Sequence, residues 1–151
     1  MAEIHVLAPL DGTVVELEAV PDEVFAQKMV GDGVAIDPSG RIAVAPVTGK
    51  LVKLFPGGHA FGIAMNNGVE LIVHIGLDTV ELKGRGFENI ATEGQLVRAG
   101  TPIVHFDRPA IERQGKVMLS PVVSSGVGKI IRRASGMVRA GQDVLFVLEV
   151  A

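Results

Sequence analysis

Short runs of apolar residues, separated by glycine and proline, recur along the whole chain. Residues 33–36, 49–54 and 144–148 are clear examples. Runs of this length between turn-forming residues are typical of short strands joined by tight turns. The pattern predicts an all-β fold, an antiparallel β-sandwich or barrel. Helical spacing is confined to short segments, and we expect only a few helical turns, at residues 22–29, 86–91 and 108–114.

Parts of the pattern occur twice. Residues 8–17 (APLDGTVVEL) are similar to residues 45–54 (APVTGKLVKL), and residues 97–106 are similar to residues 138–147. The repeats predict duplicated hairpin units within one compact fold, because no fixed period continues between them. The chain has 151 residues and no linker-like segment, so we expect a single domain over residues 1–151.

Composition narrows the possible functions. Apolar residues make up 48% of the chain and the formal net charge is −3, which argues against disorder and against a nucleic-acid partner. There is no cysteine, so disulfides, thiol nucleophiles and thiolate metal sites are excluded. The first residues carry no targeting signal and no apolar run could span a membrane, so we expect a cytoplasmic protein without membrane insertion.

The four histidines are the main candidates for chemistry, since histidine titrates near neutral pH. Alternation along their apolar runs places His5 and His105 on solvent-facing or structural positions. His74 differs because it interrupts the apolar run 69–77, in which we expect both strand faces to be covered. Gly76 lets backbone approach the ring and leaves room for a ligand. Burial would lower the pKa of His74 and keep its imidazole neutral and nucleophilic.

His59 follows a Pro-Gly-Gly turn. A histidine in such a place is usually solvated. A hairpin between its segment and residues 71–77 would instead set His59 beside His74. Asp78 could act as a rim charge or a metal ligand. The sequence has no phosphate-binding loop and no nucleophile elbow, so no nucleotide site is expected.

The chain resembles the glucose-family enzyme IIA domain of the bacterial phosphoenolpyruvate-dependent sugar phosphotransferase system. The resemblance covers residues 4–150, and its most specific part is His74-Ile75-Gly76-Leu77-Asp78-Thr79-Val80-Glu81-Leu82-Lys83-Gly84. It implies a phosphotransferase component that works through phosphohistidine. The domain would accept phosphate from the histidine-containing phosphocarrier protein HPr and pass it to the IIB domain of a sugar permease.

The resemblance also implies roles for individual residues. His74 would accept the phosphoryl group through Nε2, and His59 would stabilise it. Partners would dock on the surrounding residues, which are Asp22, Val24, Phe25, Met29, Val30, Phe55, Ile72, Asp78 and Val80. In this docking, the acidic residues Asp22 and Asp78 would meet a basic side chain of the phosphocarrier. Some of the apolar positions could equally belong to the core.

The chain departs from the family pattern at Gly57, where a threonine commonly orients the ring of the first histidine. His59 therefore lacks that side-chain partner. The chain also starts almost at the first strand, without the N-terminal extension associated with membranes in some members. Met1 favours a free-standing protein, and a domain of a longer permease is the alternative.

Two rival interpretations rest on the same residues. His74 and Asp78 have the His-x-x-x-Asp spacing of lysostaphin-type zinc peptidases, but the sequence lacks the His-x-His pair that completes such a site. Lipoyl and biotinyl carrier domains also contain repeated hairpins. They present a modified lysine at the tip of a hairpin, and no such tip is evident in this sequence. We expect no cofactor, although His59 and His74 together could bind zinc incidentally or for regulation.

Overall fold

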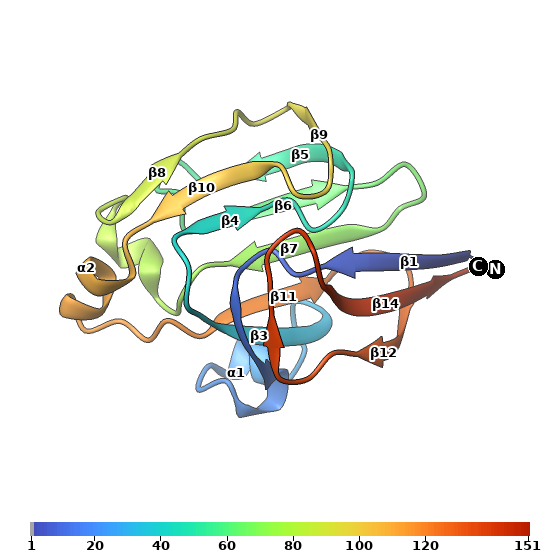
Figure 1. The fold of residues 1–151 in the computed structure, drawn as a ribbon, viewed down its shortest axis with the longest axis horizontal. Helices are drawn as coiled ribbons and strands as arrows, with labels where there is room; N and C mark the ends of the chain where they lie inside the picture. The colour runs from blue at the N-terminus through green and yellow to red at the C-terminus, as the bar shows by residue number, and fades with distance from the viewer. Residues whose placement is uncertain (1) are drawn as a thin grey trace.

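The computed structural model describes residues 2–151 and consists of β-strands with two short α-helices. Figure 1 shows the chain and its termini. The strands are β1 (Ala2–Leu7), β2 (Gly12–Glu16), β3 (Asp32–Pro38), β4 (Ile42–Val44), β5 (Gly49–Leu54), β6 (Ala60–Ala64), β7 (Glu70–His74), β8 (Phe87–Asn89), β9 (Leu96–Val97), β10 (Pro102–Phe106), β11 (Ser120–Ser124), β12 (Lys129–Arg133), β13 (Met137–Val138) and β14 (Val144–Val150). The helices are α1 (Glu23–Ala26) and α2 (Arg108–Arg113), and the 3₁₀ turns are η1 (Leu17–Ala19) and η2 (Thr79–Leu82). The predicted all-β fold is confirmed.

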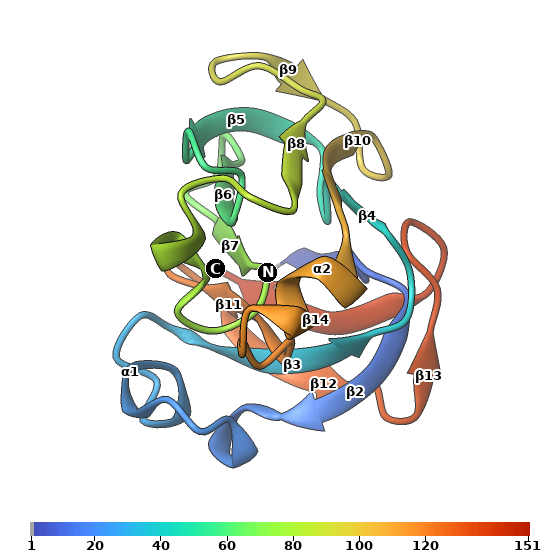
Figure 2. The same cartoon turned by 90° about the vertical axis from the view of Figure 1, so that its left-hand side faces the viewer.

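The strands form an eight-stranded sheet and two three-stranded sheets. The large sheet has the order β13-β2-β3-β11-β7-β6-β5-β9, and the small ones are β1-β14-β12 and β4-β10-β8. All strand pairs are antiparallel. The strands surround one main core, with α2 lying across the end that faces the viewer in Figure 2. Strand β7 lies between β11 and β6 and ends on the side away from the two termini (Figure 1).

The predicted duplication is visible in the backbone. The Leu7 N–H donates to the Pro46 carbonyl, and the Val44 N–H donates to the Pro9 carbonyl, so the two copies exchange equivalent hydrogen bonds. Strand β13 pairs with β2 as β9 pairs with β5. The repeated sequence therefore builds two similar units that pack against each other.

One predicted element is wrong. The segment 86–91, expected to be helical, contains strand β8, which pairs with β10 through Asn89 opposite Val104 and Phe87 opposite Phe106. The segment is short and mixes polar and apolar residues, so its sequence is compatible with a helix or a strand, and the pairing with β10 makes it a strand. The helical segments expected at 22–29 and 108–114 contain α1 and α2.

A second, smaller cluster of buried residues covers part of the outer face of the large sheet. It consists of Leu17, Val20, Phe25, Ala35, Leu77 and Val123. The connection between β2 and β3 supplies three of these residues, including Phe25 of α1. The end of β7 thus lies at the border between this cluster and solvent.

Candidate functional site

Strands β6 and β7 bring His59 and His74 together. Ala60 lies opposite His74 in the ladder, and the Ile75 N–H donates to the His59 carbonyl at 2.7 Å. The two ring centroids are 5.4 Å apart, in a nearly edge-on arrangement. The predicted hairpin contact between the two histidine segments is confirmed. The fold therefore fixes two imidazoles side by side at one end of the sheet.

The His74 ring is held in one tautomer. Its Nδ1 lies 2.6 Å from the Gly76 carbonyl oxygen. Since a carbonyl oxygen only accepts, Nδ1 carries the proton, and in the neutral ring Nε2 keeps its lone pair. Burial lowers the pKa of His74, while the Gly76 hydrogen bond and the charges of Asp22 and Asp78 oppose that shift. The lowered pKa favours the neutral ring, in which Nδ1 carries the proton and Nε2 carries the lone pair.

Gly76 is required by the backbone. Its φ of +74° is left-handed, and a Cβ there would lie 2.7 Å from Thr79 Cγ2. The Gly76 N–H donates to Ser120 Oγ at 3.0 Å, and that hydroxyl donates to the Met118 carbonyl at 2.7 Å. Thr79 Oγ1 donates to the Ile75 carbonyl at 2.7 Å. These bonds fix the carbonyl that holds His74.

Thr79 and Ser120 were not singled out from the sequence. Both are buried polar residues within otherwise apolar surroundings. Ser120 interrupts the apolar run 117–123, and a hydroxyl in such a run is a signal that could have identified it, because buried hydroxyls need partners. Thr79 stands between Asp78 and Val80 and carries no such signal.

The turn before β6 positions His59. The Gly58 N–H donates to the Phe55 carbonyl at 2.8 Å and closes a turn with Pro56 at its second position. The Phe55 and His59 rings lie with centroids 4.9 Å apart. His59 is only 7% exposed, so it is not a solvated turn residue. Burial, and then the neighbouring His74, lower the pKa of His59.

Helix α1 borders the pair on its other side. Asp22 caps the helix by accepting a hydrogen bond from the Val24 N–H at 3.0 Å. This places the buried Phe25 ring 5.2 Å from the His74 ring, measured between centroids. Phe25 therefore contributes to the burial that keeps His74 neutral.

The predicted docking residues fall into two groups. Val24, Met29, Phe55 and Val80 are exposed by 45%, 70%, 38% and 58%, although large apolar side chains are usually buried. Phe25 is buried, and Val30 and Ile72 are half-buried against the smaller cluster. The exposed group lies on the connections around the histidines. It forms an apolar rim, the name we use for Val24, Met29, Phe55 and Val80.

The two acidic residues lie close enough to His74 for their charges to affect its pKa. Asp22 is half-buried and Asp78 is exposed, with a left-handed φ of +57° just before η2. The other non-glycine residues with left-handed φ in the described chain, Lys28 and Lys83, also lie on the connections around this site. Such backbone is held only where surrounding structure requires it.

One expectation about His74 needs correction. We expected both faces of its strand to be covered, but burial alternates along β7: Leu71 and Val73 are buried, whereas Ile72 and His74 are half-buried. The apolar run suggested cover on both faces of β7, but the smaller cluster covers the outer face only in part. His74 consequently remains accessible from solvent.

The other histidines lie apart from the pair. His5 is exposed on β1 and its Nε2 lies 3.8 Å from Glu3 Oε1. His105 is half-buried on β10, opposite Glu88 and Ile42. Both were expected at structural or surface positions.

No group of three or more His, Asp or Glu side chains within residues 2–151 is placed to hold a metal ion. The pair of imidazoles falls short of the four ligands of a structural zinc site and of the three protein ligands of a catalytic one. The zinc-peptidase interpretation therefore has no ligand set in the described chain.

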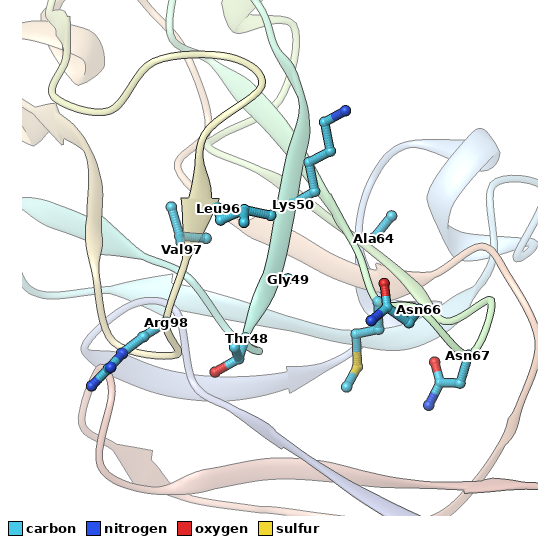
Figure 3. A pocket seen from close by; sticks show the side chains of 10 residues that line it. Thr48, Gly49, Lys50, Ala64, Asn66, Asn67, Leu96, Val97 and Arg98 are labelled. Atoms are coloured by element: carbon cyan, nitrogen blue, oxygen red, sulfur yellow. The ribbon is translucent and has the colours of Figure 1, made fainter.

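A pocket of about 580 Å³ lies at the far end of the β5–β6 hairpin, between Lys50, Asn66, Asn67 and Arg98 (Figure 3). None of its lining residues is a histidine or a carboxylate. The pocket is separate from the histidine pair. Among the described residues, no helix has the length and apolar character needed to cross a membrane.

Comparison with known proteins gives a consistent result. Residues 4–129 match the family described as phosphoenolpyruvate-dependent sugar phosphotransferase system, EIIA 1. The PTS system glucose-specific EIIA component of Haemophilus influenzae is 46% identical over 149 residues, covering 97% of this chain and 90% of that protein. The PTS system N-acetylglucosamine-specific EIICBA component of Klebsiella pneumoniae is 46% identical over 143 residues, covering 93% of this chain but 22% of that longer protein. The structure of glucose permease IIA from Mycoplasma capricolum superposes with a TM-score of 0.94 at 42% identity, covering 99% of this chain and 97% of that one.

Proposed function

The chain belongs to the EIIA 1 family of the phosphoenolpyruvate-dependent sugar phosphotransferase system, and from this premise we propose that it carries a phosphoryl group on Nε2 of His74. The observation that supports this proposal most directly is the hydrogen bond between His74 Nδ1 and the Gly76 carbonyl. It leaves the second nitrogen free as the nucleophile beside a second imidazole.

In the proposed step, the Nε2 lone pair of His74 attacks the phosphorus of a phosphohistidine on HPr. The new N–P bond forms as the N–P bond to the donor ring breaks, and the donor ring keeps the electron pair of that bond. The Nδ1 proton of His74 stays in place against the Gly76 carbonyl throughout. Transfer of this kind depends on positioning and charge stabilisation more than on covalent chemistry by the protein.

His59 is proposed to stabilise the phosphoryl group by hydrogen bonding. Its ring is buried beside His74, and its orientation is restricted by the Phe55 ring and by the backbone bond from Ile75. A donor fixed before the reaction costs no reorganisation when charge develops. His59 is therefore suited to the delivery of phosphate to the next carrier.

The apolar rim is the proposed docking surface for HPr and for the IIB domain of a sugar permease. Fusion of EIIA with other permease components in the Klebsiella protein supports a permease domain as the second partner. Asp22 and Asp78 would meet a basic side chain and steer association. We propose that no resident cofactor takes part, and that zinc bound to the two imidazoles would need further ligands from a partner or from solvent.

The test is phosphorylation of the full chain with phosphoenolpyruvate, enzyme I and HPr. The wild type should gain one phosphate that is labile in acid and stable in base, and His74→Gln should gain none. Phosphate on the His74→Gln variant would show that the acceptor is another residue. His105→Gln serves as the matched histidine control and should be phosphorylated like the wild type.

A further inference from the structure

Gly57 leaves a space beside His59 that is bounded by two nitrogen atoms. A Cβ built on Gly57 would lie 3.3 Å from the Gly84 nitrogen and 3.6 Å from His59 Nδ1. The backbone of Gly57 is not left-handed, so a side chain here causes no backbone strain, although its Cβ would push the Gly84 nitrogen away by a few tenths of an ångström. The space belongs to a pocket of about 340 Å³ lined by Phe55, Pro56, Gly57, His59, Val80 and Lys83.

Both nitrogens lack a hydrogen-bond partner among residues 2–151. The Gly84 N–H donates to no backbone carbonyl, although its neighbours Lys83 and Arg85 donate to Val80 and Leu82. The pKa of His59 is affected by burial and by His74, with no hydrogen bond contributing. His59 is largely buried, but its unpaired Nδ1 is not sealed from the pocket, so an oxygen that enters the pocket can pair with it.

We propose that this space binds a hydroxyl-type oxygen, which accepts a hydrogen bond from the Gly84 N–H and donates one to His59 Nδ1. One oxygen with both capacities can satisfy both nitrogens. The Cβ position itself is 3.3 Å from the Gly84 nitrogen and 3.6 Å from His59 Nδ1, so the oxygen must lie slightly closer to Nδ1 than that position to bond to both. The oxygen comes from a water molecule or from a hydroxyl group of a docked partner, because the pocket opens toward the apolar rim at Phe55 and Val80.

The consequence concerns the tautomer of His59. With Nδ1 accepting a hydrogen bond, the proton of the neutral ring lies on Nε2, where it can be donated to a phosphoryl group. His74 shows the opposite arrangement, with its proton on Nδ1. This inference rests on the proposed function. It makes His74 the nucleophile and His59 the hydrogen-bond donor, and each ring is fixed through its other nitrogen.

The experiment compares wild type with Gly57→Ala and Gly57→Ser by ¹⁵N NMR of the histidine rings in the unphosphorylated full chain. Both variants carry the same Cβ, so they share any crowding of the Gly84 nitrogen. Alanine excludes the oxygen, whereas serine supplies its own. In the wild type and in Gly57→Ser, the His59 Nδ1 resonance should show an accepted hydrogen bond, and in Gly57→Ala it should move to the position of a free nitrogen. The Gly84 amide proton should shift in the same variant.

Phosphoryl delivery to the next carrier should fall about fivefold in Gly57→Ala and recover in Gly57→Ser, the scale of one neutral hydrogen bond. If the wild-type resonance shows the hydrogen bond in the free protein, water is the source. If it appears only after HPr is added, the partner's hydroxyl is the source. A free or protonated Nδ1 in both samples, or equal spectra for the alanine and serine variants, would overturn the proposal. The NMR result does not depend on phosphate transfer, so failure here is distinct from failure of His74 to be phosphorylated.

Discussion

The two copies of the repeated unit differ most in the segment that joins their strands. In the second copy, residues 55–59 join β5 to β6 through a tight turn. In the first copy, residues 17–31 join β2 to β3 through η1 and α1. The strands themselves are similar and exchange equivalent backbone hydrogen bonds. The difference therefore lies in the connections, where binding and catalytic residues are commonly found.

Both connections reach His74. The short one places the His59 ring at 5.4 Å from the His74 ring, and the long one places the Phe25 ring at 5.2 Å. The short connection supplies a buried imidazole, whereas the long one supplies a buried phenyl ring and the exposed Val24 and Met29. The tight turn of one unit therefore supplies an imidazole beside His74, and the long connection of the other supplies apolar cover and two exposed apolar side chains.

Removing the imidazole of the short connection should have the largest effect. We expect His59→Gln to accept phosphate from HPr but to deliver it to the next carrier about 10²- to 10³-fold more slowly, the cost of one fixed donor to developing charge. Single-turnover measurements of acceptance and delivery separate the two steps. Equal loss in both would contradict the division of roles between the histidines.

Truncating the phenyl ring of the long connection should mainly affect stability. Phe25 is 7% exposed within the smaller cluster, and we expect Phe25→Ala to lower the free energy of unfolding by about 3 kcal/mol. Urea unfolding measures this change. Retention of full stability would show that the smaller cluster contributes little to the fold.

The same variant should change the pH dependence of His74. Burial is the main cause of the lowered pKa of His74, so Phe25→Ala should move that pKa upward, toward the ordinary value of about 6.5. A histidine whose pKa is lowered by folding costs stability as pH falls below the unfolded value, since the unfolded chain binds the proton more readily. Phosphate acceptance in the wild type should therefore persist below pH 6.5, and the variant should lose it at a higher pH than the wild type. NMR titration of the His74 ring measures both pKa values.

The docking contribution of the long connection can be tested at Met29. We expect Met29→Lys to raise the KM for HPr about tenfold with little change in kcat, because a charge replaces apolar area in the rim. Met137 is a matched control, since it is 73% exposed against 70% for Met29 and lies on β13, away from α1 (Figure 2). Equal effects of Met29→Lys and Met137→Lys would place docking elsewhere.

The sequence predicted the strands and the histidine pair because both depend on local patterns. Glycine-bounded apolar runs located β3, β5 and β14, and the Pro-Gly-Gly turn suggested the hairpin that joins His59 to His74. Gly76 was recognised as a point of close backbone approach, and its carbonyl does hold the His74 ring. In these cases the determining residues lie close together along the chain.

Features that depend on distant residues could not be predicted in the same way. Strand β8 was expected to be helical because its three residues of mixed polarity carry no clear pattern, and only the pairing with β10 makes the segment a strand. The approach of Phe25 to His74 joins α1 to β7, and the space beside His59 depends on Gly84 from the loop after η2. No local pattern specifies these contacts, since the tertiary fold alone creates them.

The smallest effect is expected at the charge that begins α1. Asn is as good a helix cap as Asp, so Asp22→Asn should keep the bond to the Val24 N–H and change stability by only a few tenths of a kcal/mol. The variant loses a charge that raises the pKa of His74, so that pKa should fall further.

Association with HPr should slow a few-fold at low salt, and the difference should vanish as salt screens the charge. Asp78→Asn is the matched variant outside α1. Stopped-flow association at two ionic strengths measures both, and a salt-independent loss in Asp22→Asn would show that its carboxylate makes a close contact with the partner instead of steering its approach.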